Sequence, residues 1–408
     1  MSDRPGIAGL RRQVPRAAIV LLVLVLAALP LYVGAFWLQV GLFVFAAGIG
    51  AIGLNLLTGT TGQLSLAHAF FLAVGAYGYA YFSGTSTSVG GGVTVGGLEL
   101  PPLLAAVLAV ALAGFAGLLF SPIAGRLRGI YLGVASLSLV FIGQHVLLNA
   151  RGVTGGFYGR NTASFSLFGF SFTETNPPLT VLNVPFGQRE RLWYLGLVLL
   201  ILCYLFATNL LRGRPGRALQ TIRDSEIAAA TMGVNVRVYK AAAFVLSSMY
   251  AGLAGVLVAL AFQRPVPDYF NLGLSITYLA MIVIGGLGSV RGAVVGAAFV
   301  TALPLVLTHY SDSLTFLAQP GENGVGPAEF ANYSYGAAII IVILVAPGGL
   351  AGLFSGRAGR AAHARATGAG PTRRTGEAPT SSVLDGREKH DPTGPASSVL
   401  VNKEATNS

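Results

Sequence analysis

Charged residues are scarce in this chain. Asp, Glu, Lys and Arg together make up 10% of its 408 residues, whereas hydrophobic residues make up 53%. Soluble globular domains carry about 25% charged residues, and the mean hydropathy here is +0.69. The composition therefore excludes an ordinary soluble protein and indicates an integral membrane protein.

Cysteine and lysine are also rare, and both absences exclude kinds of chemistry. Cys203 is the single cysteine, which rules out an internal disulfide or a cluster of thiolate metal ligands. None of the three lysines follows a glycine, so the chain lacks the Gly-Lys-Ser/Thr end of a Walker A phosphate loop. We predict no cofactor and no metal, and an ATPase that drives this protein must be a separate polypeptide.

Acidic and basic side chains are missing from the interior of every long apolar stretch. Ion-coupled carriers usually need such a residue to bind or relay the ion. This absence disfavours a proton- or sodium-coupled carrier, although backbone carbonyls could still bind sodium.

Apolar runs of about 20 residues recur along the chain, the length that a helix needs to cross a hydrocarbon core of about 30 Å. They predict an all-α fold, a polytopic transmembrane helical bundle of about ten spans. We expect these spans at residues 17–38, 40–57, 64–82, 101–122, 130–148, 192–211, 241–262, 272–288, 293–310 and 333–353. Two of them, 64–82 and 272–288, are rich in glycine and small residues and could instead be broken or re-entrant helices.

The distribution of Lys and Arg predicts the topology. With the N-terminus inside, ten spans place 21 of the 26 basic residues in cytoplasmic segments, as the positive-inside rule requires. The same topology makes the long loop 149–191 extracytoplasmic. We therefore expect both termini in the cytoplasm, with a cytoplasmic segment at 1–16, a membrane domain at 17–353 and a disordered cytoplasmic tail at 354–408. The first apolar run also resembles a signal peptide. Its length favours a retained helix, and so does the distribution of Lys and Arg, which indicates an even number of spans.

Residues 212–240 form a basic insert between two of the apolar spans. The insert contains six of the 26 basic residues and cannot lie in lipid. The Pro-Gly pair at 215–216 is expected to turn the chain out of the preceding span. Asp224 or Ser225 can cap a helix that begins there, and Gly233 can end it.

The apolar face of that helix would be small. Its members are Ile227, Ala230 and Val234. Alanine-rich faces bind lipid weakly and fit protein grooves, so we interpret the insert as a docking helix for a soluble partner. The alternative is an interfacial helix whose arginines meet anionic lipid headgroups.

Two segments, 59–77 and 285–301, share a Gly-rich turn that leads into a helix of small residues. Interrupted helices of this kind often lie at the substrate path of transporters, whereas close helix packing is the simpler alternative. We expect the polar side chains around the first turn to line a translocation path, because uncharged dipoles can face a zwitterion. These residues are Asn55, Thr58, Gln63, Ser65 and His68. For His68, a packing role is the alternative.

Several long motifs carry a family resemblance. They are GLNLLTGTTGQLSLAHAFFLAVGAY at 53–77, RLRGIYLGVASLSL at 126–139, TGG at 154–156, the stretch 216–259 and GGLGSVRGAVVGA at 285–297. In this order they resemble the LivM-type permease subunit of bacterial branched-chain amino acid ABC importers. The resemblance covers residues from about 40 to 355.

The resemblance implies an inner-membrane subunit that works by alternating access and itself hydrolyses no ATP. It would pair with a second, LivH-like permease and be driven by two cytoplasmic ABC ATPases. An extracytoplasmic substrate-binding protein would supply branched-chain or related amino acids. The basic insert would then be the ATPase coupling segment, whose role falls on Arg223, Asp224, Glu226, Ala228, Ala229 and Gly233.

This chain departs from the family pattern in two places. ABC importer permeases carry Glu-Ala-Ala-x3-Gly in the coupling segment, whereas Ile227 precedes the two alanines here and Glu226 stands one position earlier. Relatives often carry an acidic and a basic residue where this chain has Phe141 and Gln144. Related permeases carry urea or short amides, so the resemblance implies these as alternative substrates. An ATPase-independent secondary carrier or channel is the alternative from a different class.

Overall fold

The computed structural model describes residues 21–89, 92–127, 129–167, 170–172, 179–181, 184–310, 327–345 and 349–350. All of them belong to one compact unit of the chain, Met1–Ala361. The predicted N-terminal segment 1–16 and the predicted tail 354–408 lie outside the described residues, so both stay predictions.

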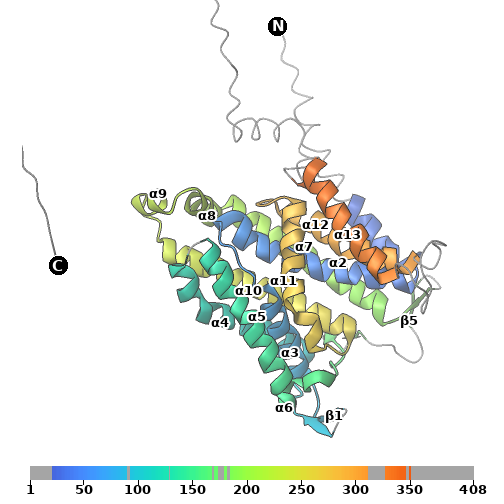
Figure 1. Ribbon diagram of the computed structural model, residues 1–408. Helices are drawn as coiled ribbons and strands as arrows, with labels where there is room; N and C mark the ends of the chain where they lie inside the picture. The colour runs from blue at the N-terminus through green and yellow to red at the C-terminus, as the bar shows by residue number, and fades with distance from the viewer. Residues whose placement is uncertain are drawn as a thin grey trace, which may run out of the picture. The chain divides into compact units, whose positions relative to one another are not determined.

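Helices make up most of the described residues (Figure 1). The longer ones are α2 (Ala35–Leu54), α3 (His68–Ser83), α4 (Pro102–Arg126), α5 (Ile130–Asn149), α7 (Gln188–Arg212), α10 (Val236–Phe262), α11 (Leu272–Gly285), α12 (Val290–Tyr310) and α13 (Pro327–Val345). An apolar helix over Leu21–Leu31 precedes them and ends in η1 (Leu29–Leu31). The short helices are α6 (Arg151–Thr154), η3 (Gly156–Tyr158), α8 (Arg214–Asp224), α9 (Glu226–Thr231) and η4 (Pro267–Phe270).

Strands occur in the described residues only as small antiparallel hairpins between helices. They pair β1 (Thr87–Val89) with β2 (Val93–Val95), β3 (Ser166–Leu167) with β4 (Phe170–Ser171), and β5 (Leu179–Val181) with β6 (Val184–Phe186). Each hairpin belongs to a connection between long helices, so none interrupts the helical bundle.

The helical membrane fold predicted from the sequence is confirmed. Each of the ten expected spans overlaps an apolar helix. Within the part of the chain that the structure describes, six helices are long and apolar enough to cross a membrane: α2 with its extension to Gly59, α4, α5, α7, α10 and α12. The count of ten spans and the side of each terminus stay predictions.

Two helix breaks interrupt the apolar stretches. After α2 the chain passes through a π-helical turn, η2 (Asn55–Gly59), and residues 62–67 are not helical. A second break at 286–289 separates α11 from α12. Gly62 and Gly288 have φ angles of 72° and 82°, which strain an L side chain but not glycine. Glycine at these positions therefore lets both breaks form.

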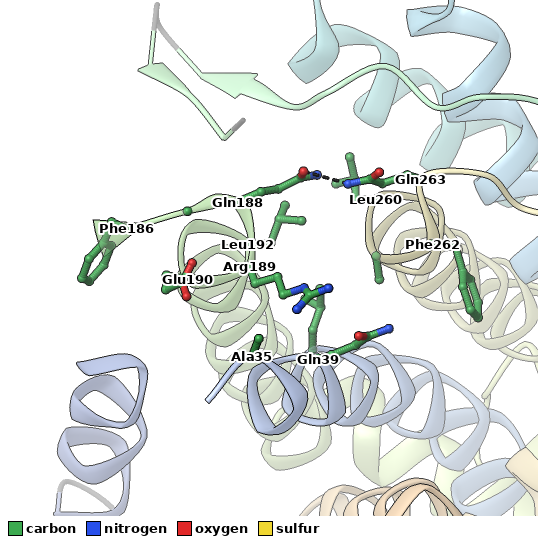
Figure 2. Close-up of a pocket in the computed structure, with 13 residues that line it drawn as sticks. Ala35, Gln39, Phe186, Gln188, Arg189, Glu190, Leu192, Leu260, Phe262 and Gln263 are labelled. Atoms are coloured by element: carbon green, nitrogen blue, oxygen red, sulfur yellow. Dashed lines mark hydrogen bonds between the residues drawn. The ribbon is translucent and has the colours of Figure 1, made fainter. Parts of the chain in front are cut away.

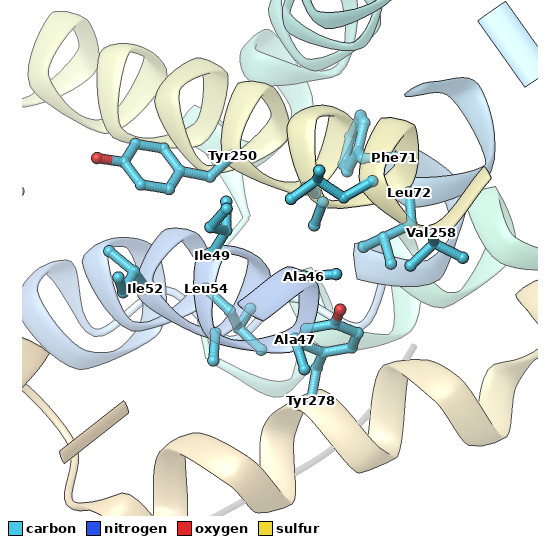
Figure 3. Close-up of a cluster of buried hydrophobic side chains, with 14 of the residues drawn as sticks. Ala46, Ala47, Ile49, Ile52, Leu54, Phe71, Leu72, Tyr250, Val258 and Tyr278 are labelled. Carbon is cyan, nitrogen blue, oxygen red and sulfur yellow. The ribbon is translucent and has the colours of Figure 1, made fainter. Parts of the chain in front are cut away.

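The helices α2 and α10 occupy the middle of the bundle. Helix α10 packs against α4, α3 and α2, and α2 also contacts α7 and α12. Figure 3 shows the apolar cluster at this centre, to which Ile49 and Leu54 of α2, Leu72 of α3 and Tyr250 of α10 contribute. Helices α4, α5 and α7 instead expose much of their apolar surface. Such a surface suits contact with lipid tails or another membrane helix.

Small residues allow the close crossing of α3 and α10. A Cβ atom at Gly255 would lie 2.9 Å from the carbonyl carbon of Leu72 and 3.0 Å from the amide nitrogen of Ala76. Membrane helices associate through such close backbone approach, because lipid tails remove the hydrophobic driving force between them. Gly255 is therefore a packing residue at the centre of the bundle.

Replacing Gly255 by alanine should lower the stability of the protein. The added methyl group must displace the backbone of α3, and overpacking a filled core costs about 1–3 kcal/mol. The matched control is Gly125→Ala on α4, where a Cβ atom would meet no heavy atom within 4 Å. Thermal unfolding in detergent measures both variants. Equal unfolding midpoints would contradict the close crossing.

Candidate functional site

The basic insert consists of two short helices, α8 and α9, that connect α7 to α10. Helix α7 ends at Arg212, and Gly213 adopts an extended conformation before α8 begins. Pro215 lies in the first turn of α8, where its fixed φ suits a helix and its missing N–H needs no partner. The expectation that 215–216 form the turn is therefore wrong. Gly213 turns the chain, and Pro215 starts the next helix.

Helix α9 begins and ends at the residues that the sequence suggests. The Ser225 side chain caps it by accepting a hydrogen bond from the Ala228 amide at 3.2 Å. At the other end Gly233 has a φ of 81°. Its amide donates to the Ala230 carbonyl at 3.0 Å, and the Val234 amide donates to the Ala229 carbonyl at 3.0 Å. This is the Schellman arrangement, in which a left-handed glycine closes a helix.

The outward face of α9 is apolar. Ile227 is 76% exposed and Met232 is 75% exposed, whereas Ala229 is fully buried. Among the other predicted coupling residues, Ala228 is half-buried and Asp224 is exposed at the end of α8. Ile227 and Met232 are therefore the large apolar side chains that a soluble partner can reach, the exposed Ala230 lies between them in sequence, and Ala229 packs inward.

An ion pair fixes α9 to α10. The Lys240 Nζ donates a hydrogen bond to the Glu226 Oε1, and Lys240 is only 3% exposed. A buried ammonium without a counter-charge would be costly. Sequence reasoning missed this role of Lys240. The available signal was a lone lysine at the entrance of an apolar helix, close in sequence to a carboxylate.

Arg223 connects the insert to the first helix break. Its Nη1 donates to the Gly59 carbonyl at 2.6 Å. Across the same point, the Gly288 amide donates to the Asn55 Oδ1 at 2.8 Å. A Cβ atom at Gly59 would lie 2.5 Å from the Gly288 nitrogen, so only glycine fits there. We call Asn55, Gly59, Arg223 and Gly288 the Gly59 junction.

The Gly59 junction brings together one predicted coupling residue and one predicted path residue. It also unites the two Gly-rich turns, which lie 229 positions apart when counted from Gly59 to Gly288. Broken helices leave backbone groups without helical partners. Here the Asn55 side chain of the first break accepts a hydrogen bond from the Gly288 amide of the second break. The Arg223 side chain of α8 donates a hydrogen bond to the Gly59 carbonyl of the first break.

The five predicted path residues lie along the first break and the start of α3. Asn55, Gln63, Ser65 and His68 are buried, and Thr58 is half-buried. Ser65 Oγ accepts a hydrogen bond from the Ala67 amide at 3.4 Å. The His68 ring packs against the Tyr278 ring with centroids 4.6 Å apart.

Four of these residues carry buried polar atoms that have no hydrogen-bond partner among the described residues. The atoms are Asn55 Nδ2, Thr58 Oγ1, Gln63 Oε1 and Nε2, and His68 Nε2. Native interiors contain few such groups, and each has a cost of about 1–3 kcal/mol. Their concentration over 14 residues of sequence marks this segment as one that can accept water or a polar solute.

None of the five path residues lines the cavity of about 700 Å³ that α2, α7 and α10 enclose (Figure 2). The unpartnered atoms are therefore packed inside the bundle in this conformation. In the described ranges, no three His, Cys, Asp or Glu side chains form a group that could hold a metal ion.

Comparison with known proteins decides the family. The family model for the permease component of the branched-chain amino acid transport system matches residues 36–346. The chain belongs to this family. The matched residues run from α2 to α13, so they include both helix breaks and the insert.

Two LivM proteins are among the relatives of this permease. The high-affinity branched-chain amino acid transport system permease protein LivM of Escherichia coli (strain K12) is 34% identical over 261 residues, which cover 60% of this chain and 57% of that protein. LivM of Salmonella typhimurium is 32% identical over 271 residues, covering 64% of this chain and 61% of that protein. The permease thus spans about three fifths of the LivM relatives it matches.

A third relative has a different name. The autoinducer 2 import system permease protein LsrC of Enterobacter sp. (strain 638) is 32% identical over 122 residues, which cover 28% of this chain and 35% of LsrC. No solved structure matches the chain. The family and the apolar helices together make the permease a multi-pass protein of the bacterial inner membrane.

Reversing one charge of the Glu226–Lys240 pair should destabilise the permease, and reversing both should restore stability. Either single variant, Glu226→Lys or Lys240→Glu, places two like charges together at a partly buried site, with an expected loss of up to about 3 kcal/mol. The double variant re-forms the pair. The control is Arg237→Glu, an exposed charge on the same turn. Thermal unfolding in detergent measures the stability of each variant. A double variant no more stable than the single variants would contradict the pairing.

Proposed function

We propose that this chain is the transmembrane permease subunit of an ATP-binding cassette importer. It moves branched-chain or related amino acids across the inner membrane by alternating access, and ATPase subunits on separate chains drive it. Family membership supports the transport role. The observation that carries the mechanism is the hydrogen bond from Arg223 to the Gly59 carbonyl, because it links the insert directly to a helix break.

The first step is docking of an ATPase against α9. Ile227 and Met232 supply an exposed apolar contact surface. Helix α9 is too short to transmit force by itself, so the connections behind it matter. The Glu226–Lys240 pair passes a displacement to α10, and Arg223 passes it from α8 to the Gly59 turn.

The second step is rearrangement of the two helix breaks. A helix that is already broken can change direction without losing regular hydrogen bonds, and such breaks recur at transporter sites. Moving the Gly59 turn away from Gly288 would open the region around Asn55, Gln63 and His68. Their unpartnered polar atoms would then meet water or the dipoles and charges of a passing amino acid.

The partners follow from this scheme. Two cytoplasmic ATPases would drive the importer, one of them docked at α9 of this chain, and a second, LivH-like permease would complete the membrane path. An extracytoplasmic binding protein would supply the substrate. One relative is a permease of an autoinducer 2 import system, so related permease chains serve different solutes. We assign selection among amino acids, urea and short amides chiefly to the binding protein.

A cysteine at Ile227 should cross-link to the ATPase subunit. The native thiol is first removed by Cys203→Ala, and Ile227→Cys then places a thiol on the exposed face of α9. Ala229 is unsuitable because it is buried. The control is Tyr158→Cys, an exposed position in the predicted extracytoplasmic loop. Bifunctional reagents on the co-expressed complex give the readout. An active complex in which Ile227→Cys captures no ATPase would contradict docking at α9.

Arg223→Ala should uncouple ATP hydrolysis from transport. The variant removes the bond to Gly59 but leaves the outward face of α9 intact, so ATPase subunits still bind. We expect uptake into proteoliposomes to fall at least tenfold, which corresponds to about 1.4 kcal/mol of lost coupling, while ATP hydrolysis continues. Arg217→Ala, an exposed arginine on the same helix, is the control.

Vesicles without ATPase subunits complete that test. If the chain is an ABC permease, these vesicles should take up no substrate under any ion gradient. Gradient-driven uptake by the purified permease alone would establish the carrier or channel alternative. Equal uptake by the Arg223→Ala variant and the parent complex would contradict the proposed coupling role of the Gly59 junction.

A further inference from the structure

A cavity of about 700 Å³ lies where the first turns of α2 and α7 approach the last turn of α10 (Figure 2). We call it the outer cavity. Apolar walls come from Leu42, Leu192, Leu260 and Phe262, and polar groups come from Gln39, Gln188, Arg189, Glu190 and Gln263. A volume of this size is typical of small-molecule sites, which combine apolar walls with a few polar groups.

The outer cavity lies at the opposite ends of α2 and α10 from the coupling segment. Helix α2 and its extension run 25 residues from Ala35, at the cavity, to Gly59, at the Gly59 junction. At 1.5 Å per residue this is about 37 Å, enough to cross a hydrocarbon core. Helix α10 runs in the opposite sense, from Lys240 beside α9 to Phe262 at the cavity. The cavity therefore opens on the membrane face that is remote from the ATPases.

Two charged side chains of the outer cavity have no partner among the described residues. Arg189 and Glu190 stand in the first turn of α7 and form no ion pair or side-chain hydrogen bond there. In Figure 2 the Arg189 guanidinium projects into the space between Gln39 and Leu260, whereas Glu190 points to another side of the helix. Arg189 is thus positioned to meet an anionic group inside the cavity.

The neighbouring groups suit the rest of an amino acid. Gln39 offers an amide oxygen and an amide NH2 on the side of α2 that faces Arg189. Leu42, Leu192 and Leu260 give an aliphatic side chain an apolar surface. A guanidinium fork matches a carboxylate with two parallel hydrogen bonds. The combination fits a small zwitterion with an aliphatic side chain better than it fits an inorganic anion.

An amide bridge closes one side of the outer cavity. The Gln263 Nε2 donates to the Gln188 Oε1 at 2.7 Å, which joins the end of α10 to the start of α7. Gln263 holds a left-handed φ of 59°, and its carbonyl accepts from the Thr162 amide at 2.8 Å. The same two glutamines line a smaller cavity of about 270 Å³ with Thr162, Ala163 and Ser164. The bridge is therefore the partition between two adjacent cavities.

We propose that the outer cavity is an entry subsite for a small amino acid with an aliphatic side chain, and that Arg189 binds its carboxylate. This inference rests on the proposed import function and adds to it a site on the permease itself. The subsite would hold the solute after its release from the binding protein. A lipid phosphate is the other anion that Arg189 could meet at this membrane face, so the experiment separates the two sources.

The test compares leucine with leucine amide, which lacks the carboxylate. Binding of each radiolabelled compound is measured on the full transporter complex in nanodiscs, without ATP and without the binding protein. We expect the parent complex to prefer leucine at least tenfold. Arg189→Gln should reduce that preference to less than threefold, and Arg189→Lys should keep part of it because the charge remains.

Arg151→Gln is the matched control, since it removes an exposed arginine of the predicted extracytoplasmic loop that does not line the outer cavity. It should leave the preference unchanged. Equal loss in Arg151→Gln and Arg189→Gln would overturn the assignment, because a general surface potential would then explain it. An unchanged preference in Arg189→Gln would overturn it directly.

Lipid composition tests whether Arg189 meets an anionic lipid headgroup, because phosphatidylcholine carries no net charge whereas phosphatidylglycerol is anionic. The measurements are repeated in nanodiscs of phosphatidylcholine alone and with phosphatidylglycerol added. An Arg189→Gln effect that requires phosphatidylglycerol would assign Arg189 to lipid and overturn the subsite. ATP-driven uptake of leucine by the complete system is measured separately. Uptake without any Arg189 effect refutes the subsite alone, whereas absence of ATP-driven uptake refutes the proposed function.

Discussion

Backbone groups that leave a helix inside a membrane protein must find partners within the protein, since lipid offers none. The breaks between α2 and α3 and between α11 and α12 create this requirement at the coupling end of the bundle. Asn55 meets it from one side by accepting from the Gly288 amide, and Arg223 meets it from the other by donating to the Gly59 carbonyl. The two breaks and α8 are therefore bound to one another at a single polar point.

The proposed mechanical coupling depends on the same hydrogen bonds. If an ATPase displaces the insert, the displacement reaches the membrane helices only through contacts strong enough to persist during the movement. Arg223 and the Glu226–Lys240 pair are both charge-assisted contacts, which are shorter and stronger than neutral hydrogen bonds. The outward face of α9 is apolar and lacks such contacts. The insert thus has an exposed apolar surface that a partner can contact, and its other side is held to the bundle by charge-assisted hydrogen bonds.

The sequence predicted the helical fold, the position of the insert and the ends of α9, because each depends on local signals. Long apolar runs, a capping serine at 225 and a glycine at 233 act through neighbouring residues only. Contacts between distant segments carry no such signal. The pairing of Lys240 with Glu226, and the meeting of Asn55 with Gly288, depend on how whole helices pack. The predicted apolar face of α9 is exposed at Ile227 and Ala230, but the burial of Ala229 escaped prediction, because an alanine-rich sequence does not show which alanine faces inward.

The two ends of α2 and α10 differ in whether their charged groups have hydrogen-bond partners within the chain. At the coupling end the charges of Arg223, Glu226 and Lys240 are occupied by bonds within the chain. At the other end Arg189 and Glu190 have no such bonds among the described residues. Asn55, Gln63 and His68, at the Gly59 junction and in the segment that follows it, hold buried polar atoms without partners among the described residues. A fixed end suits force transmission, whereas free charges suit reception of a solute. The order of these groups along the bundle therefore agrees with solute entering at the cavity and force entering at the insert.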